Sequence, residues 1–65
     1  MGYVVRSKEK HDGMYIYYTG LHNGVPQFQL AEGERNTPHQ AYMFEDMLKA
    51  VQYVVRDFEV VKVVS

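Results

Sequence analysis

The sequence contains no cysteine, and this absence removes two ways of stabilising a short chain. Without cysteine there is neither a disulfide nor a thiolate zinc site. A chain of 65 residues buries only about 60% of the surface that it exposes when unfolded, so its core alone gives a stability near zero. We therefore expect a second copy of the chain to contribute, and predict a homodimer.

An excess of charge and a long apolar run are also missing. Seven basic and eight acidic residues give a formal net charge of −1, which disfavours nucleic acid as a partner. No apolar run approaches the roughly 18 residues that cross a bilayer, and the N-terminus lacks the pattern of a secretory signal. The sequence therefore predicts a cytoplasmic protein with no membrane partner.

Side chains for catalysis are scarce. Ser7 and Ser65 are the only serines, and neither stands in a motif with a base and an orienting acid. Glu45 and Asp46 are neighbours in a predicted helix, where adjacent side chains point about 100° apart. We predict no enzymatic activity, no catalytic residue and no cofactor.

Ten valines and six tyrosines favour β-structure. Strands are predicted at residues 2–7, 14–19, 25–30 and 58–64. The pairs Asp12-Gly13 and Asn23-Gly24 mark the turns between the first three. Pro26 has no N–H to donate, and this places the third strand at an edge of the sheet.

A helix is predicted to begin at Thr37. Thr37, Pro38 and Gln40 have the pattern of a capping box with proline at the first helical position. The helix is expected to end near Tyr53, within a segment, residues 52–57, that has no glycine or proline to mark the boundary. Its predicted core-facing stripe, at alternating steps of three and four, comprises Ala41, Phe44, Leu48, Val51 and Val55.

These elements predict a single α+β domain over residues 1–65. Its order is β-β-β-α-β, with one helix on one face of a four-stranded, mostly antiparallel sheet of order 3-2-1-4. A single helical crossing makes the last strand parallel to the first. The side chains assigned to the helix side of the sheet are Ile16, Tyr18, Phe28, Leu30, Phe58 and Val60.

Two sets of residues are predicted to bind a partner. The second face of the sheet is too apolar to remain in water, and its residues, the proposed dimer contact, are Val4, Tyr15, Tyr17, Val61 and Val63. The second set is a stripe on the outer side of the helix, where tyrosine offers a large area at low entropy cost. Its members are Tyr42, Asp46 and Tyr53, with Lys49 between them.

Three alternatives use other chemistry. Arg6, Lys8 and Lys10 lie at the same end of the sheet as the predicted helix N-terminus, an arrangement that can hold a small anion or nucleic acid. Tyr15 and Tyr17 could stack on bases. A metal site would combine histidines with nearby carboxylates, but no recognised ligand spacing is present, so we predict none from His11, His39, Asp12, Glu32 and Glu34.

The order of the apolar segments resembles that of small proteins of unknown function encoded by bacteriophages and prophages. The segments are Tyr3-Val4-Val5, Met14-Tyr15-Ile16-Tyr17-Tyr18, Ala41-x-x-Phe44 and Val60-Val61-Lys62-Val63-Val64. The resemblance implies an accessory protein that binds a host or phage protein, and it assigns no site residue. Together with the composition, it leads us to expect a non-catalytic protein-binding module.

Overall fold

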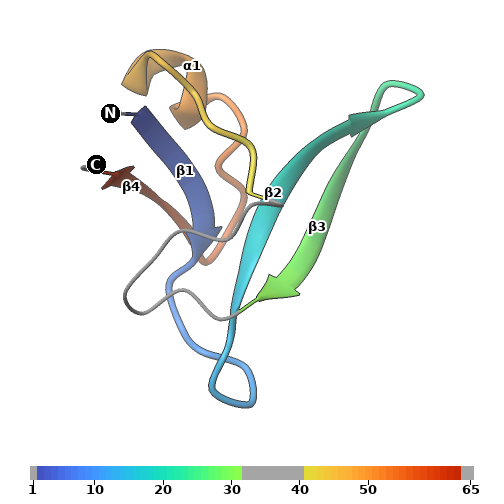
Figure 1. Ribbon diagram of the computed structural model, residues 1–65, viewed down its shortest axis with the longest axis vertical. Coiled ribbons are helices and arrows are strands. Elements are labelled where there is room, and N and C mark those ends of the chain that lie inside the picture. The colour runs from blue at the N-terminus through green and yellow to red at the C-terminus, as the bar shows by residue number, and fades with distance from the viewer. Residues whose placement is uncertain (1, 32–40, 64–65) are drawn as a thin grey trace.

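The computed structural model describes residues 2–31 and 41–63. Four strands form one sheet of order β3-β2-β1-β4, and one helix packs against it (Figure 1). This confirms the predicted α+β fold, including the edge position of the strand that contains Pro26. The elements are β1 (Gly2–Ser7), β2 (Tyr15–His22), β3 (Val25–Ala31), α1 (Met47–Val51) and β4 (Phe58–Val63).

Both predicted turns form where the paired turn residues stand. Asn23 and Gly24 have φ of 51° and 79°, the positive values that a two-residue type I′ turn needs. Asp12 and Gly13 have φ of 54° and 78°. β2 extends to His22, beyond the predicted end at residue 19, because the strand continues through a bulge at which Gly20 has a φ of 119°.

The predicted helix from Thr37 is wrong over the described residues 41–46. Residues 37–40 lie outside the described residues, but Phe44 is extended and pairs with Tyr3 of β1 through two backbone hydrogen bonds of 2.8 Å. Tyr42 donates its N–H to the carbonyl of Tyr18 in β2. The segment thus lies between β1 and β2 where these strands diverge (Figure 1), and both strands supply the hydrogen bonds that a helix would otherwise make internally.

Helix α1 begins instead after Asp46, whose carboxylate accepts from the N–H of Leu48 at 2.9 Å. It ends at Val51, two residues before the predicted end. The predicted stripe is wrong as a result: Phe44 is buried through its strand pairing, whereas Leu48 is 73% exposed and Val51 is 50% exposed. Ala50 is the helical residue that packs on the sheet.

Strand β4 is antiparallel to β1, which corrects the predicted parallel direction. Gly2 is opposite Val63 and Ser7 is opposite Phe58, and the two arrows point in opposite directions in Figure 1. The extended segment 41–46 leads toward the end of the sheet at which α1 lies, and the residues after α1 lead back to the opposite end, where β4 begins (Figure 1). A single long helix would have left β4 to begin at the other end of the sheet and to run parallel to β1.

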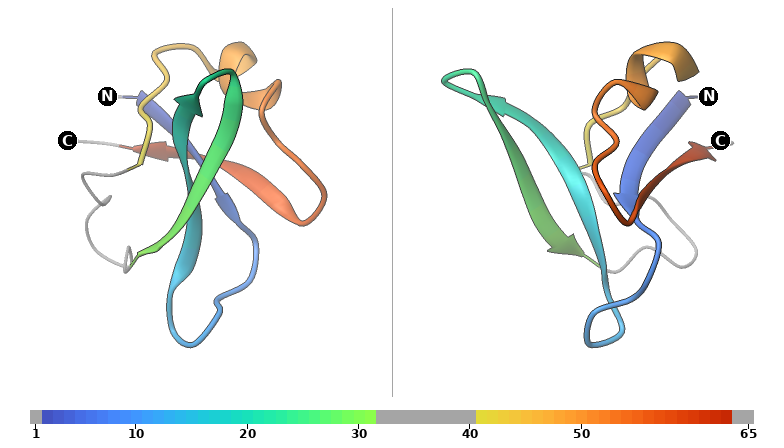
Figure 2. Two further views of the ribbon diagram at one scale, coloured as in Figure 1. Left: turned by 90° about the vertical axis from the view of Figure 1, so that its right-hand side faces the viewer. Right: turned by 180° about the vertical axis from the view of Figure 1, so that it is seen from behind.

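The core is an aromatic cluster around Tyr18 of β2. Its ring stacks on Tyr53 at 4.9 Å and on Phe44 at 5.7 Å between centroids, and it also meets Tyr42 and Phe28. The β2–β3 hairpin and the β1–β4 pair cross in Figure 2, and the contact between Phe28 of β3 and Phe58 of β4 joins the two pairs. The other residues of the core, on the helix side, are Tyr3, Val5, Ala50, Val54, Phe58 and Val60.

Candidate interaction surfaces

The second face of the sheet is closed at its centre. Val4 is 1% exposed and Tyr17 is 2% exposed, so neither side chain presents a contact surface in this state. Tyr15, Val61 and Val63 are partly buried. The expectation that this whole face lies open is therefore wrong at Val4 and Tyr17, whereas the binding role of the five residues stays a prediction.

Tyr15 is held by charged neighbours. The guanidinium carbon of Arg6 lies 4.0 Å from the centroid of its ring, and Nζ of Lys10 lies 5.7 Å away. Arg6 also forms a 3.4 Å ion pair with Glu59. Partial burial by itself lowers the pKa of Arg6, but Tyr17, Tyr15 and Glu59 raise it above its ordinary value. Arg6 therefore occupies one face of the Tyr15 ring, on which a nucleobase would otherwise stack.

The predicted tyrosine stripe does not form, because α1 has five residues and all three members lie outside it. Asp46 is the N-cap and Tyr42 lies in the extended segment. Tyr53 follows the helix, and its ring packs on Tyr18 and Phe44 in the core. Of the three, Tyr42 and Asp46 are exposed.

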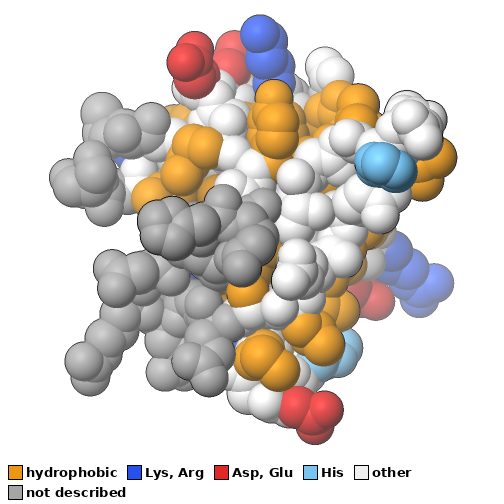
Figure 3. Space-filling model, turned by 45° about the vertical axis from the view of Figure 1, so that its right-hand side comes forward, with side chains coloured by type: hydrophobic (Ala, Val, Ile, Leu, Met, Phe, Trp, Pro, Cys, Tyr) orange, Lys and Arg blue, Asp and Glu red, His pale blue; other side chains and the backbone are white. Residues whose placement is uncertain are grey.

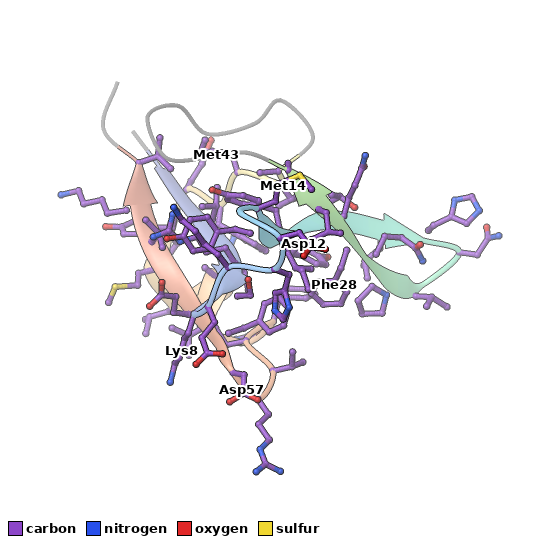
Figure 4. All side chains as sticks on the ribbon, turned by 90° about the horizontal axis from the view of Figure 1, so that it is seen from below. Lys8, Asp12, Met14, Phe28, Met43 and Asp57 are labelled. Atoms are coloured by element: carbon purple, nitrogen blue, oxygen red, sulfur yellow. The ribbon has the colours of Figure 1, made fainter. Side chains whose placement is uncertain are left out.

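The basic end of the sheet has no helix N-terminus beside it among the described residues. Arg6, Lys8 and Lys10 lead into the turn at the bottom of Figure 1, and α1 lies at the top. Lys8 lies near Asp57, whose carbonyl accepts its backbone N–H at 2.9 Å (Figure 4). The predicted anion arrangement relied on a helix beginning at Thr37, and the described helix begins at Met47.

The histidine and carboxylate set is only partly described. His11 is exposed, and it pairs with Met14 across the first turn. Within residues 2–31 and 41–63, no group of three or more histidine, aspartate or glutamate side chains could hold a metal ion. The remaining members of the set, Glu32, Glu34 and His39, lie outside the described residues.

Strand β3 is a surface feature that the sequence reasoning missed. Every residue from Val25 to Leu30 is exposed, on both faces of the strand. Phe28 points from the hairpin toward the rest of the molecule and meets the ring of Phe58, yet it remains 39% exposed (Figure 4). The signal was present in the sequence: none of the fifteen charged residues lies between positions 13 and 31.

Helix α1 carries a second apolar surface. Its smallest apolar residue, Ala50, is fully buried, whereas its three largest, Met47, Leu48 and Val51, are at least half exposed. We call these three residues the α1 surface. Hydrophobic side chains reach the exterior in the upper part of Figure 3, just below the charged side chains at the top, which is the end of the molecule at which α1 lies. A helix that faces water with its larger apolar side chains is the reverse of the usual amphipathic arrangement.

No family model, curated protein or solved structure matches this chain. In the part of the chain that the structure describes, no helix has the length and apolar character needed to cross a membrane.

Proposed function

We propose that this chain is a non-catalytic protein-binding module, an accessory protein of a bacteriophage or prophage that acts by protein–protein interaction. The observation that carries the proposal is the α1 surface. Leu48 is 73% exposed between two other half-exposed apolar residues. Exposed apolar patches on small proteins often mark contact sites, because covering them removes apolar area from water.

The local chemistry of α1 supports a contact role over a purely structural one. The helix is anchored by the Asp46 cap and by Ala50 in the core. Its leucine, methionine and valine side chains are already exposed in the unbound protein, so a partner can cover them without opening the core. The phage context rests on the resemblance of the segment order alone.

Binding of a small anion or a nucleic acid has less support. Arg6 is engaged by Glu59 and by the ring of Tyr15, and Tyr17 is buried. The dependence of binding on salt concentration distinguishes this alternative from protein binding. Phosphate-driven binding weakens by orders of magnitude between about 50 and 200 mM salt, whereas an apolar protein contact changes little.

The test is capture of a partner from a lysate of the organism that carries the gene, with three forms of the protein. We expect a partner that the wild type and Glu45→Gln retain at both salt concentrations and that Leu48→Glu loses. Glu45→Gln is the matched control, because Glu45 is also exposed and lies just before the helix. Equal capture by all three forms, or a partner released as salt rises, would contradict the proposal.

Both variants must be folded for this comparison. Leu48 and Glu45 are surface residues, so the thermal midpoint of each variant should stay close to that of the wild type. Circular dichroism during heating checks this before the capture experiment is interpreted.

A further inference from the structure

The two edges of the sheet differ in how they are protected against pairing with another strand. β4, at one edge, carries Glu59 and Lys62. β3, at the other edge, has no charged residue, and Pro26 stands near its beginning. Natural proteins guard exposed edges with charge, proline or bulges, because an open edge recruits other strands. The rest of β3, residues 27–31, has neither charge nor proline.

The type I′ turn fixes which backbone groups of β3 point outward. His22 and Val25 are paired on either side of this turn. In a two-residue type I′ hairpin the residues that flank the turn form a hydrogen-bonded pair, so the backbone groups of Val25 face β2. Backbone groups then alternate along an antiparallel strand. Gln27 and Gln29 therefore also turn their N–H and C=O groups toward β2, whereas Phe28 and Leu30 turn theirs to the outer edge. No other described strand pairs with that edge.

We propose that this edge binds a second copy of the chain, with the two β3 strands pairing antiparallel about a two-fold axis at Gln29. In this register Phe28 of each copy is opposite Leu30 of the other. All outward N–H and C=O groups of both residues then form hydrogen bonds between copies, and Pro26 is not needed as a donor. The two sheets become one continuous sheet across the axis.

Two arguments favour a second copy over a different protein. A strand is complementary to itself under a two-fold axis, the commonest symmetry of soluble oligomers. A charge near that axis would meet its own copy, and residues 13–31 contain none.

This contact is separate from the α1 surface, so it can hold or fail independently of the proposed function. It also differs from the dimer predicted from the sequence, which used the face that contains Val4 and Tyr17. The β3 edge requires no buried side chain to become exposed.

Sedimentation equilibrium at micromolar concentrations tests the proposal with charges placed at the axis. We expect the wild type to be a dimer. Gln29→Lys and Gln29→Glu should each weaken dimerisation on the order of tenfold. Gln29 lies opposite its own copy in a non-hydrogen-bonded pair, whose Cα atoms are about 4.5 Å apart, so either substitution brings two like charges together. A one-to-one mixture of the two variants should restore the dimer, since opposite charges meet. Gln29 is exposed, so neither substitution disturbs the core.

The matched control is Leu21→Lys, which adds the same charge to the same hairpin on the inner strand β2. It should leave the dimer intact. A monomeric wild type at the highest concentration would overturn the proposal and leave the edge to another protein. A Leu21→Lys variant as weak as Gln29→Lys, or a mixture of the Gln29 variants that stays monomeric, would also overturn it.

Discussion

Tyr18 is the residue on which the packing of this small protein depends most. Its ring is 2% exposed and meets four other aromatic rings, from β3, the extended segment and the residues after α1. Burial raises the pKa of its hydroxyl above the ordinary value, and the neighbouring Tyr53 and Tyr42 add to the effect. The folded state therefore favours the neutral phenol.

This shift predicts a loss of stability at alkaline pH. Below a pH of about 10 the phenol is neutral in both the folded and the unfolded chain, so its contribution is fully present. As pH rises above about 10, Tyr18 ionises in the unfolded chain while it is still neutral in the folded chain. The contribution of Tyr18 to the free energy of unfolding therefore falls until the pH reaches the raised pKa of the folded state. Thermal midpoints measured from pH 8 to pH 11.5 should fall less steeply for Tyr18→Phe than for the wild type. Parallel curves would contradict this assignment.

At the scale of single elements, α1 and the extended segment before it differ in burial, although the periodic pattern predicts the same core-facing role for both. The pattern places Leu48 and Phe44 on one core-facing stripe. In the structure Phe44 is buried by strand pairing with Tyr3, and Leu48 faces water. Substitutions at these two positions therefore have very different costs.

Phe44→Ala should reduce the free energy of unfolding by about 3–5 kcal/mol, because it leaves a cavity among stacked rings. A domain of this size has a total stability of roughly 3–10 kcal/mol, so the variant will be close to unfolded at room temperature. Leu48→Ala should change the free energy of unfolding by less than about 0.5 kcal/mol. Urea denaturation followed by circular dichroism measures both. Equal losses would show that Leu48 is a core residue after all.

At the scale of the whole molecule, the direction of β4 is the feature most open to a direct test, because the chain has no cysteine of its own. Arg6 and Glu59 are opposite one another on antiparallel strands. Lys62, which would be opposite Arg6 if β4 were parallel, is instead opposite Tyr3, about 10 Å along the strand from Arg6.

Arg6→Cys/Glu59→Cys should therefore form an intramolecular disulfide under mild oxidation, and Arg6→Cys/Lys62→Cys should not. Disulfides join residues whose Cα atoms lie about 4.4–6.8 Å apart, which suits directly opposed residues on neighbouring strands. Mass spectrometry after blocking of free thiols counts the oxidised pairs. Preferential oxidation of the second pair would indicate the parallel arrangement.

The amino-acid sequence by itself determined the strands, the turns and the order of the sheet, because each depends on chemistry within a few residues. Asp12-Gly13 and Asn23-Gly24 accept positive φ at low cost, and this places the two turns. Pro26 lacks an N–H, which excludes β3 from the centre of the sheet. The valine-rich segments at both ends of the chain then became β1 and β4.

Only the tertiary structure decided what residues 41–46 became. The spacing of their apolar residues suits a helix. However, β1 and β2 diverge, so the backbone groups of Tyr3 in β1 and the carbonyl of Tyr18 in β2 do not bond to one another and need other partners. Tyr42 and Phe44 satisfy those groups only when extended, a requirement that arises from strands far away in sequence. That choice shortened the helix, reversed β4 and exposed Leu48, because a local pattern carries no information about which distant backbone groups need a partner.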